Sequence, residues 1–140
     1  MIRTTLIHLT VILFLFGCSE NSTEPNVDVI FGNYSSSLFT LALDGNSPID
    51  VLSAGGYINI ELSEDSTTIG ELFIPDTLDL TGGGDLKFNL IGQFKLEGNS
   101  ITFEQNADTF IRNAEWLYSS QKISGNYSKD GVVIEVVLQK

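Results

Sequence analysis

The feature that most constrains the fold of this chain is an alternation of apolar and polar residues with a period of two. The clearest case spans residues 86–97, where one face carries Leu86, Phe88, Leu90, Phe94 and Leu96 and the other carries Lys87, Asn89, Gln93, Lys95 and Glu97. Successive side chains of a strand point to opposite sides. The pattern therefore indicates strands with one dry and one wet face, typical of antiparallel sheets. No stretch has the length and 3.6-residue period of a packed helix.

The same alternation recurs along the chain, interrupted by Gly-, Asn-, Asp- and Ser-rich turns. It predicts eight strands, at residues 33–43, 57–63, 67–74, 85–97, 100–105, 113–119, 122–128 and 131–139. Residues 49–54 are expected to form a single helical turn that ends at Gly55 and Gly56. Eight sequential strands without a covering helix predict an all-β fold, an eight-stranded antiparallel up-and-down barrel, with a β-sandwich as the alternative.

Residues 1–17 have the composition of an export signal. One positive charge, Arg3, precedes an apolar run over residues 6–16. That run is too short to cross a bilayer, which takes about 20 apolar residues, so we expect it to be removed during export. Residues 18–28 are polar and predict a flexible tether. Residues 29–140 then form the folded domain, which is long enough for one core.

The end of the apolar run, Leu15-Phe16-Gly17-Cys18, resembles the lipobox of bacterial lipoproteins. The resemblance implies diacylglyceryl transfer to the Cys18 thiol, cleavage before Cys18 and acylation of the new N-terminus. Phe16 is bulkier than the residue usual in the family. Cys18 is the only cysteine of the chain and has no disulfide partner. The alternative is an ordinary secretory signal with a chance cysteine. In a Gram-negative host, Ser19 implies delivery to the outer membrane, because the sorting rule retains lipoproteins with Asp at this position.

The charge of the mature chain limits its partners. Removal of residues 1–17 takes away Arg3 and leaves six basic against 18 acidic residues, a net charge of −12. Phosphate backbones and anionic lipid headgroups repel such a surface. We therefore expect no nucleic-acid partner, and membrane attachment has to come from the acyl chains.

The residue types left in the mature chain argue against an enzyme. It contains no histidine, and acylation of Cys18 removes the only thiol. The usual general base, the thiol nucleophile and the common zinc ligands are thus missing. Four carboxylates lie around one predicted hairpin, and we interpret them as a solvated surface: Glu61, Glu64, Asp65 and Glu71. The Gly- and Asp-rich turns lack the spacing of a known calcium loop. No cofactor or metal is expected.

The domain resembles a small bacterial lipocalin-like protein. Gly32-Asn33-Tyr34 is similar to the Gly-x-Trp opening of the first lipocalin strand, residues 50–56 to the turn that follows it, and Lys140 to the basic residue that ends the last strand. The resemblance implies that Gly32, Tyr34 and Lys140 close one end of the barrel, with Tyr34 packed beneath Lys140. Tyr in place of Trp and Lys in place of Arg depart from the family pattern, so avidin-like and other small barrels stay open as alternatives.

A lipocalin-like barrel implies a carrier for a small apolar or amphipathic ligand. The candidate ligand contacts are the aromatic residues Phe39, Phe88, Phe103, Trp116 and Tyr127, with Arg112 as an anionic-headgroup clamp at the rim. Arg112 has an alternative interpretation as an ion pair with Asp108. The inward residues are almost all large and apolar, and no interior polar residue is expected to orient a ligand. The second functional hypothesis is therefore a structural or protein-interaction module of the envelope with a filled core.

Overall fold

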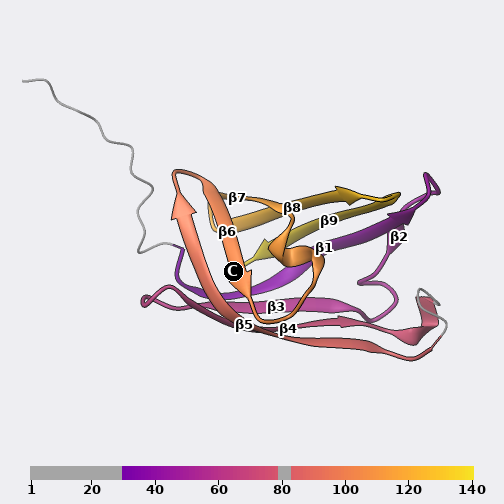
Figure 1. Cartoon of the computed structure of the whole chain (residues 1–140), viewed down its shortest axis with the longest axis horizontal. Coiled ribbons are helices and arrows are strands. Elements are labelled where there is room, and N and C mark those ends of the chain that lie inside the picture. Colours follow the sequence, from indigo (N-terminus) through magenta and orange to yellow (C-terminus); the bar gives the residue numbers. More distant parts are fainter. Residues whose placement is uncertain (1–29, 79–82) are drawn as a thin grey trace, which may run out of the picture.

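Pairing between the first and the last strand closes the sheet of this protein into a barrel (Figure 1). The computed structural model describes residues 30–78 and 83–140. The eight strands of the barrel are β1 (Gly32–Leu43), β3 (Tyr57–Leu62), β4 (Thr67–Ile74), β5 (Leu86–Glu97), β6 (Ser100–Gln105), β7 (Glu115–Ser119), β8 (Lys122–Lys129) and β9 (Val132–Gln139). Each strand pairs antiparallel with the next, and β9 pairs with β1. The predicted closed up-and-down barrel is confirmed, and the β-sandwich is not formed.

The segment after β1 differs from the expected helical turn. Ile49–Asp50 form a two-residue strand, β2, which pairs with Thr40 and Leu41 of β1. Only residues 51–55 form a turn. The physical reason is that β3 pairs with β1 no further than Ser35, so the later part of β1 has a free edge. Val51 is fully buried, and its N–H donates to the carbonyl oxygen of Phe39 at 2.9 Å.

Two inward-facing glycines allow the barrel wall to bend. An ideal Cβ on Gly92 would overlap the carbonyl oxygen of Glu104, and one on Gly70 would overlap that of Asn59. Only glycine lets neighbouring backbones approach so closely. Gly92 also marks the point where the partner of β5 changes: residues 86–91 pair with β4 alone, Gly92 and Gln93 pair with both β4 and β6, and residues 94–97 pair with β6 alone. The long strand thereby serves both sides of the barrel.

Large side chains fill the interior of the barrel. The largest of those that are less than 2% exposed are Trp116, Tyr34, Phe39 and Phe103. The rings of Phe103 and Trp116 pack edge to face, with centroids 5.4 Å apart. Besides these apolar side chains, the polar residues Thr68 and Gln105 are also buried. Both lie on inward strand positions next to Gly92, where the bend brings β4 and β6 around β5.

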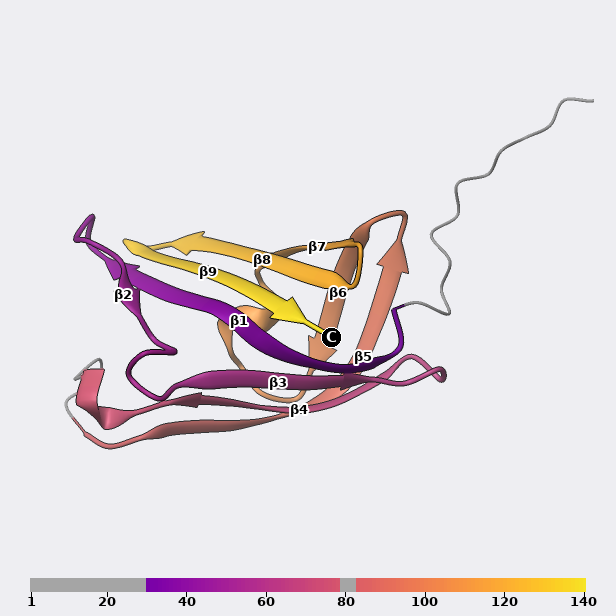
Figure 2. The same cartoon turned by 180° about the vertical axis from the view of Figure 1, so that it is seen from behind.

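The chain enters the barrel at one end, called here the entry end. It carries the turns at residues 63–66, 98–99 and 120–121, and the C-terminus lies beside them (Figures 1 and 2). Ile30 is buried there, and the Tyr34 hydroxyl donates to its carbonyl oxygen at 2.6 Å. Longer connections lie at the opposite end, called the loop end; one of them holds the short 3₁₀ helix η2 (Asp76–Leu78). The predicted signal, Cys18 and the tether fall outside the described residues.

Candidate functional site

The barrel wall has a gap between β6 and β7. Only two residue pairs join these strands, Ser100 with Leu117 and Ile101 with Trp116. From there β6 continues to Gln105, while β7 begins only at Glu115 and the strands diverge (Figures 1 and 2). The prediction placed the start of the β7 strand two residues earlier. The short 3₁₀ helix η3 (Phe110–Arg112) occupies the connection instead, because it directs its apolar residues inward.

Backbone groups of β6 point into this gap. In an antiparallel sheet, alternate residues of a strand bond to opposite neighbours. Asn99 accepts from the N–H of Tyr118 on the β7 side, whereas Asn106 donates to Ile91 on the β5 side. By this alternation, Phe103 and Gln105 direct their N–H and C=O groups toward β7. Within residues 30–78 and 83–140, no backbone group bonds to either residue across the gap.

A groove of about 480 Å³ follows the unpaired edge of β6. It is lined by Thr102, Phe103, Glu104, Gln105, Arg112 and Asn113. The Arg112 guanidinium lies 3.8 Å from the Asp108 carboxylate, and both side chains are exposed, so this ion pair contributes little to stability. Both amide atoms of the Gln105 side chain are buried without a hydrogen-bond partner among the described residues. The groove thus combines backbone edge, charged side chains and a buried amide.

Apolar contacts hold η3 in place beside β6. Ile111 is fully buried, and its carbonyl oxygen accepts a 2.9 Å hydrogen bond from Nε1 of Trp116. The Phe110 ring lies 6.1 Å from the rings of both Phe39 and Tyr127. These contacts attach η3 to the core and to β7 and β8, and the groove lies between η3 and the outer part of β6.

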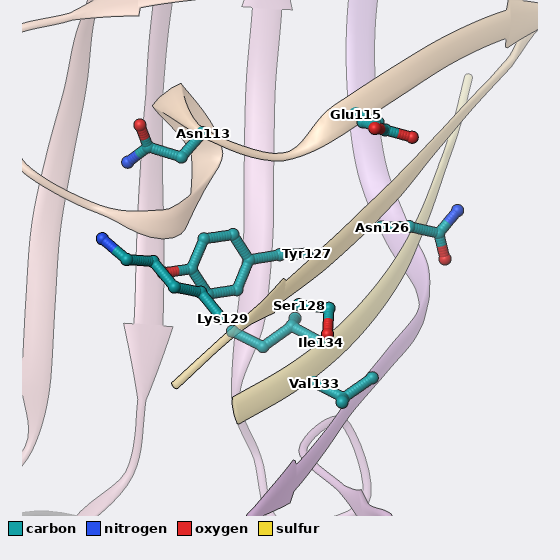
Figure 3. A pocket seen from close by; sticks show the side chains of 8 residues that line it. All are labelled: Asn113, Glu115, Asn126, Tyr127, Ser128, Lys129, Val133 and Ile134. Atoms are coloured by element: carbon teal, nitrogen blue, oxygen red, sulfur yellow. The ribbon is translucent and has the colours of Figure 1, made fainter. Parts of the chain in front are cut away.

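A second groove, of about 370 Å³, lies on the other side of Asn113. It is lined by Asn113, Glu115, Asn126, Tyr127, Ser128, Lys129, Val133 and Ile134. Figure 3 shows Tyr127 and Lys129 extending to one side of β8 and Asn126 to the other. Tyr127 is half-buried and contacts Phe110. An aromatic ring beside an amine gives this groove an amphipathic character.

The predicted ligand contacts separate into two groups. Phe39, Phe103 and Trp116 are core residues, whereas Phe88 and Tyr127 are only half-buried. Their role as ligand contacts stays a prediction, as does the clamp role of Arg112. The prediction missed the groove residues Gln105 and Asn113. For Gln105, the available signal was the alternation of Ile101, Phe103 and Gln105, which places Gln105 on the inward face.

At the entry end, the side chain of Lys140 lies over Gly32. Its Cε is 2.6 Å from the position that a Cβ on Gly32 would take. Burial, and then the nearby hydroxyl of Tyr118, raises the pKa of the Tyr34 phenol well above its usual value. The neutral hydroxyl is therefore the form that the fold holds against Ile30. Packing of Tyr34 beneath Lys140 stays a prediction.

The carboxylates around the hairpin at residues 63–66 lie on the outer wall. Glu71 pairs with Lys87 at 2.8 Å and accepts a hydrogen bond from the Tyr57 hydroxyl. Lys87 first, and then Tyr57, lowers the pKa of Glu71. Asp65 accepts from the backbone N–H and the hydroxyl of Thr67, which lowers its pKa and stabilises the turn. These contacts are surface and turn interactions.

Comparison with known proteins does not indicate the kind of site, so the geometry is the guide to it. No protein-family model, no curated protein and no solved structure matches the chain. In the part of the chain that the structure describes, no helix is long and apolar enough to span a bilayer.

Proposed function

We propose that this protein is a lipid-anchored, non-enzymatic binding module of the bacterial cell envelope that engages a protein partner through its outer wall. The observation that carries the proposal is the filled interior. Trp116, Tyr34, Phe39 and Phe103 are each at most 2% exposed and occupy the space where a carrier holds its ligand. An eight-stranded barrel is narrow enough for side chains alone to fill it. Recognition of a partner then takes place on the outer wall of the barrel.

The proposed anchor keeps the domain close to the membrane. Lipid on Cys18 attaches the chain to a membrane, the outer one in a Gram-negative host by the rule for Ser19, and residues 18–28 form the tether. An eleven-residue flexible tether has a root-mean-square reach of about 18 Å. Because the chain enters at the entry end, this end is the one nearest to the point of attachment. Thr102 and Glu104, on the exposed face of β6, lie on the side wall and are accessible to a partner.

The groove in Figure 3 favours a second candidate function, a carrier for a small amphipathic ligand. Its volume of about 370 Å³ falls within the usual range for ligand sites. In this candidate function the Tyr127 ring contacts the apolar part of the ligand, and Lys129 binds an anionic head. The ligand binds at the rim of the barrel in this case, since the interior is filled.

A titration with laurate separates the two functions. The probe is added to the full, isotope-labelled chain in detergent, and amide and methyl signals are followed by NMR. The interaction module predicts no saturable change at core residues such as Leu72 and Ile123, nor at Tyr127. Saturable changes at Tyr127 that Lys129→Gln abolishes support the carrier, with Lys122→Gln as the matched control. Saturable changes in the core overturn the filled-barrel proposal itself.

A crosslinking experiment tests the protein partner directly. A photoreactive residue replaces Thr102 at the gap or, as a control, Gln139 on β9, and the cells are illuminated. The proposal predicts that the photoreactive residue at position 102 forms a discrete protein adduct, and that this adduct depends on Cys18. If neither these positions nor others on the outer wall form a protein adduct, the interaction module is wrong.

A further inference from the structure

We propose that the outer wall of β1, β3, β4 and β5 binds an arginine or lysine side chain of the protein partner together with a neighbouring apolar one. The inference rests on the proposed function and names the surface and the kind of partner. These four strands are consecutive in the sheet and lie side by side (Figures 1 and 2). Their outer wall combines a polar hollow, a carboxylate without an ion pair and an exposed apolar pair.

The hollow crosses β1, β3 and β4. Its volume is about 330 Å³, at the lower end of the range for ligand sites. Asn33 lies opposite Glu61, and Glu61 lies opposite Ile69, so these residues form one row across the three strands. The side chains that line the hollow are exposed, and each adjoins a buried residue along its strand, which places them on the outer wall: Asn33, Ser35, Asn59, Glu61 and Ile69.

The polar groups of the hollow suit a cation. Glu61 supplies a carboxylate, and the two asparagines beside it supply amide oxygens, while no basic residue is among those that line the hollow. Within residues 30–78 and 83–140, Glu61 forms no ion pair, whereas Glu71 in the next row is already bound to Lys87. A guanidinium or ammonium group has only donors, so it matches these acceptors, and its apolar stem packs along Ile69. The net charge of −11 for the whole chain adds long-range attraction for a basic partner.

The exposed apolar pair adjoins the hollow. Ile69 is 58% exposed and Ile91 is 50% exposed, and they lie directly opposite each other on β4 and β5. Among the large apolar residues that are exposed in the described part of the chain, no other two are paired with each other. Apolar residues scattered singly on a surface are ordinary. An apolar pair with a polar hollow at its side has the layout of an interface centre and its rim.

The distance between the hollow and the apolar pair defines the partner segment. Adjacent strands are about 4.8 Å apart, so Glu61 on β3 lies about 7 Å from the middle of the pair formed by Ile69 and Ile91. An extended segment that crosses the strands places its residues i and i+2 on one face at about the same separation. The preferred segment is therefore Arg or Lys, then any residue, then Leu, Ile or Val. Side chains make these contacts, so the segment can run in either direction.

A peptide titration tests the two contacts. The probe acetyl-Arg-Ser-Leu-amide is added to the full, isotope-labelled chain in detergent and followed by NMR. Binding in the millimolar range is expected, with saturable shifts at Glu61, Ile69 and Ile91. Citrulline in place of arginine keeps the shape but removes the charge, and should weaken binding about threefold. Glu61→Gln should weaken binding of the arginine peptide equally and abolish the difference between the two peptides, because they share one interaction.

Control variants separate recognition from folding. Glu135→Gln on β9 should leave the affinity unchanged. Ile69→Thr keeps a β-branched residue in the strand and should weaken binding about threefold through lost apolar contact, with the remaining amide signals unchanged. Leu117→Thr is its matched control on β7. Equal affinity of the citrulline peptide, shifts elsewhere on the barrel or no binding overturns the inference. Maltotriose that produces the same shifts also overturns it and assigns the hollow to a neutral sugar.

Crosslinking in cells tests the same surface on the real partner. A photoreactive residue at Asn89, beside Ile91 on the outer face of β5, should form a protein adduct that Glu61→Lys removes and Glu135→Lys retains. An interface of usual size, about 800 Å² per partner, is about 30 Å wide and can include positions 89 and 102. An adduct at position 102 without one at position 89 would overturn the inference and leave the proposed function in place.

Discussion

The indole Nε1 of Trp116 donates a hydrogen bond of 2.9 Å to the carbonyl oxygen of Ile111. Trp116 is 1% exposed and Ile111 is fully buried, so the bond lies within the core. It joins the short helix η3 to β7, the strand that follows it. The bond thereby helps to hold η3 in its place beside β6.

Trp116→Phe should destabilise the domain by about 1–3 kcal/mol. The variant keeps an aromatic ring against Phe103 but leaves the buried carbonyl of Ile111 without its donor. Urea unfolding measures the loss. Leu117→Phe, at the exposed neighbouring position, is the control and should change stability by less than about 0.5 kcal/mol. Equal stability of the two variants would show that the hydrogen bond contributes nothing.

Gly92→Ala should destabilise the barrel by about 3 kcal/mol or prevent its folding. The added Cβ meets the backbone of Glu104, which cannot move without separating β5 from β6. Gly83→Ala is a suitable control, because nothing lies within 4 Å of its Cβ position. Thermal melts of the two variants are compared with the parent chain. A stable Gly92→Ala protein would mean that β5 bends elsewhere.

Tyr34→Phe should cost about 1 kcal/mol near neutral pH, through loss of the hydrogen bond to Ile30. The pKa of Tyr34 is raised in the folded state from an ordinary value near 10. Its contribution to stability is therefore fully present below pH 10 and declines as the pH rises above it, because the unfolded chain ionises first. Urea melts from pH 7 to 11 should show the difference between parent and variant narrowing above pH 10. A difference that is constant with pH would contradict this linkage.

The lipocalin-like closure predicts coupling between Tyr34 and Lys140. Tyr34→Ala should cost about 2–4 kcal/mol through lost aromatic burial. Lys140→Gln should cost at most about 1 kcal/mol, the size of an exposed cation–π contact. If the side chains are in contact, the two losses are not additive in a double-mutant cycle measured in urea. Additive losses would remove this lipocalin feature.

Cys18→Ser should abolish membrane association. The acyl chains supply an affinity that a domain of net charge −12 lacks. Palmitate labelling and fractionation of cells measure the effect. Equal labelling and equal membrane recovery of the variant would rule out the lipoprotein interpretation.

Most of the fold follows from alternation in the sequence, and β5 illustrates the reason. Inward Phe88 lies opposite Leu72, and outward Asn89 lies opposite Glu71, as the two faces require. A slip of one residue would exchange the faces, so the hydrophobic pattern determines the register. Local sequence and long-range pairing agree along this strand, and its predicted limits differ from the observed ones by one residue.

The gap could not be predicted in the same way. Phe110 and Ile111 are two consecutive apolar residues, too short a run to show the period of a strand or of a helix. Their place is decided by tertiary contacts with Phe39, Tyr127 and Trp116, which lie on other strands. The two-residue strand β2 was missed for a related reason. It forms because β1 has a free edge, and that depends on where β3 stops pairing.

The pairing of β1 with β9 also has a consequence for the time course of folding. The register from Ser35 with Gln139 to Leu43 with Val132 joins strands at opposite ends of the sequence. Such distant contacts are formed late, because a long loop has to close before they contribute. During synthesis, the second edge of β1 stays uncovered until residues 132–139 have been made. A nascent chain that lacks β9 therefore exposes a long unpaired strand edge, the kind of surface that promotes aggregation.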